Sequence, residues 1–262
     1  MNKPSSIYDS TRLAAGYAYH RPPVHQAIVR RIGERLELTG KVKCALDVGC
    51  GAGLSTAALE PLAESVISIE PVHAMLTFSK IVAPKSAFLV GQAEHLPLAA
   101  RSFDLMTAAG AINYADRDLF LPEAERVLTP EGTLVIYDFS AGCRCASDGR
   151  LQQWFEEFKQ RYPSPPGYAL DAQALDYRRY GLKLSGYEQF EVALPMTPDA
   201  YLAYVMSETS VEQAILRGVP ESEIRAWCQN TLSDVLGDTS LEILFDAYIA
   251  YVIRDWRGKF IG

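Results

Sequence analysis

The chain has 262 residues, with 25 Lys or Arg and 32 Asp or Glu, so its formal net charge is −7. Apolar residues make up 48% of the sequence and charged residues 22%, which is typical of a packed globular protein and excludes disorder as the main state. An acidic chain has no overall attraction for phosphate backbones. We therefore expect a small-molecule ligand and no nucleic-acid partner.

The five cysteines and four histidines lack the spacing of a disulfide framework or a structural zinc site. We expect reduced cysteines and no bound metal. The segment from Met1 to Leu13 is too polar for a signal peptide, and no apolar run reaches the length of about 18 residues that a membrane span needs. The sequence predicts a cytoplasmic protein that does not insert in a membrane.

The period of the apolar residues changes repeatedly along the chain. Apolar residues four positions apart predict a helix over Val24–Leu36, and the next apolar run predicts a strand over Val42–Val48. A glycine cluster separates that strand from a predicted helix over Leu54–Leu62. The later predicted strands are Ser65–Ile69, Ala87–Val90, Phe103–Ala108, Gly132–Phe139, Glu188–Leu194 and Phe245–Ile253, and the later helices are Val72–Val82, Asp118–Leu128, Leu151–Arg161, Pro198–Arg217 and Glu221–Leu236.

Strands that alternate with helices predict a parallel sheet covered on both faces, because each parallel connection needs a crossover. We expect an α/β fold with a doubly wound, mostly parallel, Rossmann-like sheet of seven strands. Three segments follow from this organisation. Residues 1–40 would form a helical cap, residues 41–140 the ligand-binding α/β core, and residues 141–262 helical lid insertions with the last two strands.

The turn after the first long strand contains three glycines, Gly49, Gly51 and Gly53. A P-loop would need Lys followed by Ser or Thr where Leu54 and Ser55 stand, and a dinucleotide fingerprint would need a glycine at position 54. Glycines in this pattern let the backbone approach a ligand closely, because they carry no Cβ.

Glu70 lies 17 residues beyond Gly53, a separation that fits one helix and one strand. The spacing places its carboxylate at the end of the second strand, beside the glycine turn. A carboxylate at this position can accept hydrogen bonds from both hydroxyls of a ribose. The glycine turn and Glu70 together are more specific than either feature alone.

On these residues the chain resembles the class I S-adenosyl-L-methionine (SAM)-dependent methyltransferases. Within that class it is similar to the small-molecule branch that includes ubiquinone-biosynthesis and trans-aconitate-type enzymes. The matching segments are Ala45–Gly53, Ile69–Leu76, Gly91–Leu98, Ser102–Leu105 and Arg126–Gly132. The resemblance implies the class I methyltransferase fold, SAM as the cofactor, and methyl transfer to a small molecule through a carboxylate or hydroxyl group.

The resemblance also implies which residues bind SAM. They are Asp47, Gly49, Cys50, Gly51, Gly53, Glu70, Pro71, Met75, Gln92, Ala93, Glu94 and Ala109. The glycine turn and Asp47 would hold the methionine part, Glu70 the ribose, and Met75 the adenine. Two positions depart from the family pattern: Gln92 stands where Asp is usual, and Asn113-Tyr114 where His-Trp is common.

Methyl transfer depends mainly on alignment of the two reactants, so the sequence assigns no compulsory base. The catalytic candidates are Arg21, Asn113 and Tyr114, and the substrate-binding candidates are Tyr19, Arg21, Arg178 and Arg179. Tyr8, Tyr17, Tyr19 and Tyr114 are either packing residues or cation–π partners of the sulfonium.

Charge is distributed unevenly along the chain. Residues 1–43 carry a net charge of +5, and the remainder carries −12. We therefore expect the N-terminal segment to face an anionic ligand, with Arg21 paired with a carboxylate of the cofactor or the acceptor.

Two other functions stay open on the sequence alone. The chain could be a SAM-binding protein without transferase activity, or a nicotinamide-dependent oxidoreductase, which Leu54 disfavours. Both a monomer and a homodimer are compatible with the sequence.

Overall fold

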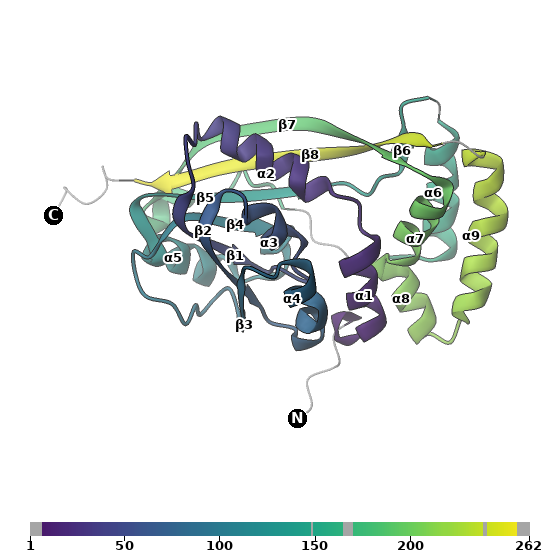
Figure 1. The fold of residues 1–262 in the computed structure, drawn as a ribbon, viewed down its shortest axis with the longest axis horizontal. Helices are drawn as coiled ribbons and strands as arrows, with labels where there is room; N and C mark the ends of the chain where they lie inside the picture. Colours follow the sequence, from purple (N-terminus) through teal and green to yellow (C-terminus); the bar gives the residue numbers. More distant parts are fainter. Residues whose placement is uncertain (1–6, 148, 165–169, 238–239, 256–262) are drawn as a thin grey trace.

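The computed structural model describes residues 7–147, 149–164, 170–237 and 240–255, and an eight-stranded sheet runs through its centre (Figure 1). The first six residues of the predicted N-terminal cap lie outside the described residues. The parallel strands are β1 (Val42–Val48), β2 (Ala63–Glu70), β3 (Ala87–Val90), β4 (Phe103–Ala109) and β5 (Leu128–Phe139). The antiparallel strands are β6 (Arg144–Cys145), β7 (Leu182–Met196) and β8 (Leu241–Arg254).

The strand order β3-β2-β1-β4-β5-β8-β7 confirms the doubly wound, mostly parallel sheet. The chain order reverses between β1 and β4, so the carboxyl ends of these strands form the edge at which such sheets bind ligands. The seven predicted strands are present. An eighth, β6, consists of two residues that pair with β8, and it was not predicted because so short a strand has no periodicity.

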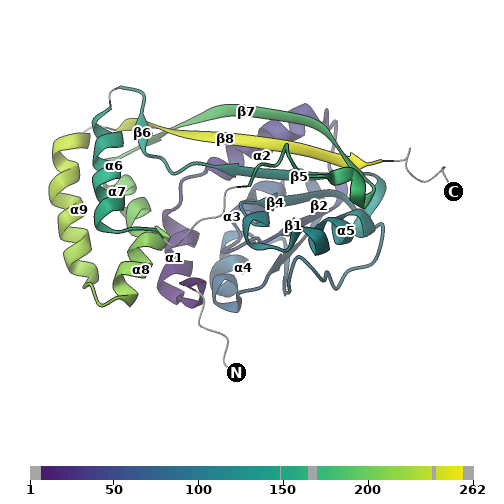
Figure 2. The ribbon, with the colours of Figure 1, turned by 180° about the vertical axis from the view of Figure 1, so that it is seen from behind.

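Helices cover both faces of the sheet. The α-helices are α1 (Thr11–His20), α2 (Val24–Arg35), α3 (Leu54–Leu59), α4 (Ser79–Val82), α5 (Arg117–Val127), α6 (Arg150–Arg161), α7 (Pro198–Met206), α8 (Thr209–Leu216) and α9 (Glu221–Leu236). The 3-10 helices are η1 (Ile7–Asp9), η2 (His73–Phe78), η3 (Ile112–Tyr114) and η4 (Tyr177–Tyr180). Helix α2 is nearer the viewer in Figure 1 and α5 in Figure 2, in agreement with two buried clusters on opposite faces.

Alternation along β5 shows how the sequence builds these two faces. Val135 and Tyr137 pack in the cluster with α2 and α3, whereas Leu134 and Ile136 pack in the cluster with α5. All four side chains are buried, as expected for a central strand covered on both sides.

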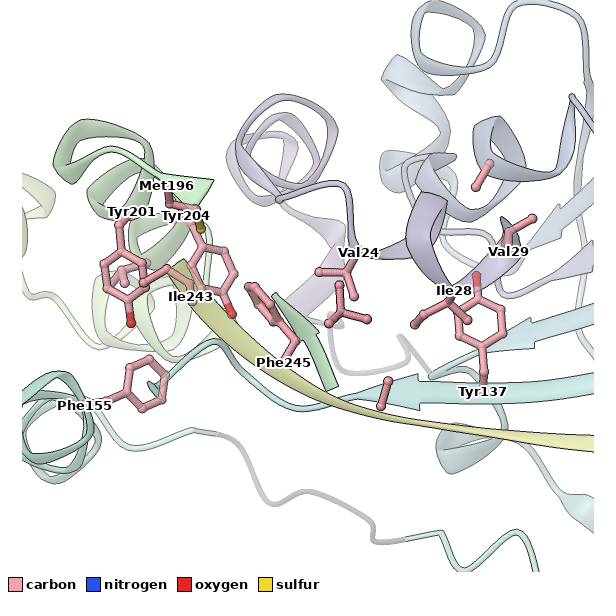
Figure 3. Close-up of a cluster of buried hydrophobic side chains, with 14 of the residues drawn as sticks. Val24, Ile28, Val29, Tyr137, Phe155, Met196, Tyr201, Tyr204, Ile243 and Phe245 are labelled. Atoms are coloured by element: carbon pink, nitrogen blue, oxygen red, sulfur yellow. The ribbon is translucent and has the colours of Figure 1, made fainter. Parts of the chain in front are cut away.

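The first of these clusters continues beyond the sheet. It joins Val24 and Ile28 of α2 to Tyr137, then to Phe245 of β8 and Tyr204 of α7 (Figure 3). Helices α6 to α9 form a group at one end of the molecule (Figures 1 and 2). This group shares a hydrophobic core with the sheet.

Three predicted helices differ from the structure. The predicted helix over Val72–Val82 is η2 followed by the short α4, and the helix from Leu54 ends at Leu59. The single helix predicted over Pro198–Arg217 is two helices, because the Ser207 backbone N–H and hydroxyl both donate to the Tyr204 carbonyl and α8 begins after Glu208. Local hydrogen bonds of this kind compete with helix continuation and are invisible to apolar periodicity.

Strand β7 is longer than the predicted strand Glu188–Leu194. Pairing with β8 extends it to Leu182–Met196, with a register shift between Leu184 and Gly186. The alternation of apolar and polar residues does not reveal the N-terminal part of this extension, because the bulge beside Gly186 interrupts it.

Candidate active site

A cavity of about 670 Å³ lies at the carboxyl ends of the parallel strands. Its floor comes from the loops after β1, β2, β3, β4 and β5, and its cover from η1, α1 and the start of α2. Such a volume accommodates a cofactor-sized ligand. The predicted edge of the sheet is therefore hollow, and the N-terminal segment covers it.

The glycine turn forms one wall of the cavity. Gly49 has φ of +71°, and a Cβ at this position would lie 2.3 Å from the Cβ of Ala111. Gly51 has φ of +53° and faces the methyl group of Met75. Both backbones line the cavity, and any side chain at Gly49 would collide with the loop after β4.

Asp47 lies beneath this wall and does not line the cavity. Its carboxylate accepts hydrogen bonds from Ser55 Oγ (2.6 Å), Thr56 Oγ1 (2.7 Å) and Thr107 Oγ1 (2.9 Å). Burial raises the pKa of Asp47, although these three hydroxyl donors act in the opposite direction. Asp47 thus ties the glycine turn to α3 and β4.

Glu70 ends β2 and lines the cavity. Its Oε2 accepts from the Gly51 N–H and its Oε1 from the Val72 N–H, each at 3.0 Å. Each carboxylate oxygen can accept one more hydrogen bond from a ligand. Burial raises the pKa of Glu70, against the effect of the two backbone donors.

The structure brings most of the predicted cofactor residues to one cavity. Those that line it are Gly49, Gly51, Glu70, Pro71, Met75, Ala93, Glu94 and Ala109. Four do not: Asp47 and Cys50 are buried behind the wall, Gly53 begins α3, and Gln92 is exposed in a bridge with His95.

A second part of the cavity, away from the glycine turn, is formed by the loop after β4 and by the end of β5. Asp138 Oδ1 accepts from the Phe139 N–H (2.8 Å), and its Oδ2 accepts from Asn113 Nδ2 (3.2 Å). A Cβ on Gly110, which has φ of +60°, would lie 3.1 Å from Asp138 Oδ1. Burial raises the pKa of Asp138. This end therefore presents a carboxylate held by two donors.

His25 of α2 also lines this end, and its Nδ1 lies 2.9 Å from the Tyr137 hydroxyl. Burial, together with the charge of Arg21, lowers the pKa of His25 to about 4. The imidazole is therefore neutral at physiological pH.

Arg21 lies in the cover of the cavity, where its charge already has a partner. Its guanidinium is 3.0 Å from Glu208 and donates to the Ser207 carbonyl, also at 3.0 Å. The guanidinium carbon lies 4.2 Å from the centre of the Tyr17 ring. Its Nε is buried and has no hydrogen-bond partner among the described residues.

The other acceptor candidates are divided between the cavity and the surface. Asn113 and Tyr114 line the cavity, together with Tyr8 and Tyr17, and the hydroxyls of Tyr8 and Tyr114 are 3.2 Å apart. Tyr19, Arg178 and Arg179 are not among the lining residues. Tyr19 packs on Phe78, and Arg179 lies 3.8 Å from Asp118 at the start of α5.

His25 and Asp138 were not predicted from the sequence as site residues. Asp138 could have been found as an acid at the end of a parallel strand, the same position as Glu70. His25 carries no sequence signal, because only packing of α2 over β5 brings it to the cavity.

Within the described residues, no group of three or more His, Cys, Asp or Glu side chains is arranged to hold a metal ion. In the same ranges, no helix has the length and apolar character needed to cross a bilayer.

Comparison with known proteins identifies the segment that carries the glycine turn and Glu70. Residues 46–136 match the family model described as a methyltransferase domain. The match runs from β1 to β5 and shows similarity to that domain.

Curated relatives match the same part of the chain. An uncharacterized methyltransferase of Mycobacterium tuberculosis is 33% identical over 97 residues, which are 37% of this chain and 40% of that protein. Demethylmenaquinone methyltransferase of Beutenbergia cavernae is 35% identical over 115 residues, 44% of each chain. The chain thus spans about two fifths of the length of these relatives.

Solved structures share the fold over most of the chain. A putative type II methyltransferase from Anaeromyxobacter dehalogenans aligns with a TM-score of 0.67 at 22% identity, covering 87% of this chain and 95% of that one. The [4+2]-cyclase SpnF aligns with a TM-score of 0.52 at 19% identity, covering 87% of this chain and 81% of that one. At these identities the similarity shows the fold alone.

The segment that matches the family model ends within the cavity. Glu70, Met75 and Glu94 belong to the matched segment, whereas Asp138 and His25 lie outside it. The cavity is therefore lined both by the matched segment and by residues outside it.

Proposed function

We propose that this protein is a SAM-dependent methyltransferase that methylates a small-molecule acceptor. The observation that carries the proposal is the convergence on one cavity of Gly49, Gly51 and Glu70, which lie within the segment that matches the family model. The fit of SAM is supported by the missing Cβ atoms of the turn and by the free acceptor capacity of Glu70.

Each part of the cofactor has a candidate partner in the cavity. Glu70 would accept from the ribose hydroxyls, Met75 would pack on adenine, and the glycine backbone would face the methionine part. Arg21 Nε, a buried donor, would bind the methionine carboxylate. These assignments keep the predicted roles of Gly49, Gly51, Glu70 and Met75, whereas Asp47 would act by holding the turn.

SAM supplies a methyl group activated by its positive sulfur. The chain's contribution is to position the acceptor and to exclude water. Floor loops at the ends of β1, β2 and β3 would hold the cofactor, which leaves the space over β4 and β5 for the acceptor. Tyr8, Tyr17 and Tyr114 would close this space from above.

Isothermal titration calorimetry with SAM and with its demethylated product S-adenosylhomocysteine (SAH) tests the cofactor assignment. Glu70→Gln keeps the size of the side chain but removes its charge. Because a hydrogen bond to a charged group contributes about 1.5–3 kcal/mol, we expect both ligands to bind roughly 10-fold to 100-fold more weakly. The matched control is Glu64→Gln, an exposed acid on the same strand, which should leave both affinities unchanged. If the parent protein binds neither SAM nor SAH, the proposal is wrong.

The shared fold with a [4+2]-cyclase means that cofactor binding alone does not establish methyl transfer. Transfer of labelled methyl from SAM to any component of a cell extract would establish it. SAM binding without transfer would favour a role for SAM as a bound ligand only, whereas tight NADH binding without SAM binding would favour an oxidoreductase.

A further inference from the structure

The cavity end over β4 and β5 offers a ligand two hydrogen-bond acceptors. Asp138 is a carboxylate at the end of β5, and Asn113 Oδ1 is buried without a hydrogen-bond partner among the described residues. Asn113 Nδ2 is already used, since it donates to Asp138 Oδ2. A buried acceptor without a donor is destabilising, so this end favours a ligand that donates a hydrogen bond.

Charge at the cavity wall points the same way. The described lining residues contain three carboxylates, Glu70, Glu94 and Asp138, and one guanidinium, Arg21. Glu208 neutralises Arg21 at 3.0 Å. A carboxylate acceptor would therefore meet Asp138 without a compensating cation from the described lining residues, in a site where water screens charge poorly.

His25 is a poor candidate for the base. Its Nδ1 lies 2.9 Å from the hydroxyl of the fully buried Tyr137, so this nitrogen already takes part in a hydrogen bond. A pKa of about 4 also makes this imidazole a weak proton acceptor at neutral pH. Asp138 is thus the remaining titratable acceptor at this end.

We propose that the methyl acceptor is an uncharged hydroxyl compound and that Asp138 accepts the proton of its hydroxyl group. This proposal rests on the methyl transfer proposed above. The proton passes from the acceptor O–H to an Asp138 carboxylate oxygen. The acceptor oxygen forms a bond to the methyl carbon, while the carbon–sulfur bond breaks and leaves its electron pair on sulfur. The products are a methyl ether, a neutral thioether and protonated Asp138, which then releases its proton to water.

The surroundings of Asp138 suit this role. Burial raises the pKa of its carboxyl, which makes the carboxylate a better proton acceptor than an exposed one. The Asn113 amide and the Phe139 N–H hold both oxygens in place. The other titratable or charged side chains near this end are His25 and Arg21 from the cover, Tyr114 from η3, Tyr137 from β5 and Tyr248 from β8.

The probe for this proposal is 4-nitrophenol, whose phenol and phenolate forms differ in absorbance. A carboxylate that accepts a hydrogen bond from the phenol O–H stabilises the neutral form and repels the phenolate, so binding to the SAH-saturated protein should raise the probe's apparent pKa by at least one unit. Benzoate, the matched carboxylate, should bind at least 10-fold more weakly. Asp138→Asn should abolish the pKa shift of 4-nitrophenol and reduce the difference in affinity between 4-nitrophenol and benzoate.

Two controls accompany this variant. Asp138→Asn is isosteric, and the Asn113 amide can turn so that its unpartnered oxygen accepts from the new amide; circular dichroism checks that the fold is kept. Glu64→Gln removes an exposed carboxylate of β2 that does not line the cavity, and it should leave the probe's pKa shift unchanged.

Benzoate binding as tight as that of 4-nitrophenol, no binding of 4-nitrophenol at millimolar concentration, or an unchanged shift in Asp138→Asn would each overturn the inference. SAH affinity is measured in parallel and should stay within about twofold in Asp138→Asn. If the parent protein fails to bind SAH, the proposed function fails, while the comparison of the two probes on the protein alone still tests the acceptor end.

Discussion

At the scale of single residues, the site combines backbone positions that need glycine with carboxylates held by backbone donors. Gly49 leaves room for Ala111, and Gly110 leaves room for Asp138. Glu70 and Asp138 end two different parallel strands, and each accepts from a backbone N–H of a nearby residue. Both carboxylates are therefore fixed before a ligand arrives, which reduces the entropy lost on binding.

His25 gives the protein a stability that depends on pH. Its pKa is about 4 in the folded protein and about 6.5 in an unfolded chain, so the folded state disfavours the proton. Stability from this group is present above pH 6.5 and is lost as the pH falls toward 4. Because His25 faces a cavity that water can enter, we expect a loss of about 2 kcal/mol across this range.

Urea denaturation of the parent protein and of His25→Gln, from pH 7 to pH 4, measures this contribution. The difference between the two proteins isolates His25 from the other groups that titrate in the same range. We expect the parent to lose more stability than the variant on acidification. Equal pH slopes would show that His25 is readily protonated in the folded state.

At the scale of elements, two ion pairs dock α1 against α8 and the turn that precedes it. Arg12, near the start of α1, lies 2.5 Å from Glu212, and Arg21, which follows α1, lies 3.0 Å from Glu208. The Arg12 and Arg21 guanidiniums also donate to the carbonyls of Met206 and Ser207, at the end of α7. The cover of the cavity is thus attached to the helical group at the far end of the molecule.

A double-mutant cycle on Arg21 and Glu208 tests this attachment. Removing one partner leaves a largely buried charge unpaired, so Arg21→Ala and Glu208→Ala should each destabilise the protein by about 3 kcal/mol. The double variant should lose less than the sum of the two. Additive losses in urea denaturation would show that the pair is not coupled. The exposed pair of Arg144 with Glu191 is the control, and its removal should change stability little.

At the scale of the whole molecule, the sheet and the cavity cover differ in how much apolar packing holds them. The sheet lies between two large buried clusters, whereas α1 and η2 meet in a small one built around Ala14, Ala52 and Met75. Regions with little buried apolar contact open more readily. A ligand in the cavity would contact both the floor and this cover.

Hydrogen exchange with and without SAH tests the consequence. We expect SAH to slow exchange of amides in α1 and η2 by at least 10-fold, because the ligand adds contacts to the least packed part of the cavity. Amides in β8 and α9, which contribute no residue to the cavity lining within the described ranges, should be unchanged and serve as the control. The prediction would be contradicted if SAH slowed exchange equally in all elements, or if it left exchange in α1 unchanged.

The sequence by itself determined strand β1, the glycine turn that follows it and the position of Glu70 at the end of β2. These depend on neighbours in the chain, since a strand, a tight turn and a crossover helix bring Gly51 and Glu70 to one edge whatever the rest of the molecule does. The bounds of β1, β3 and α9 were predicted from patterns that are equally local.

Only the tertiary structure decided which residues form the other end of the cavity. Arg21 meets Glu208, and His25 meets Tyr137, across separations of 187 and 112 residues. Such contacts depend on how α2 packs on β5 and how α7 and α8 dock against α1, and no periodicity records them. Arg21, which the sequence predicts to face an anionic ligand, is paired with Glu208, and Asp138 is brought to the cavity lining.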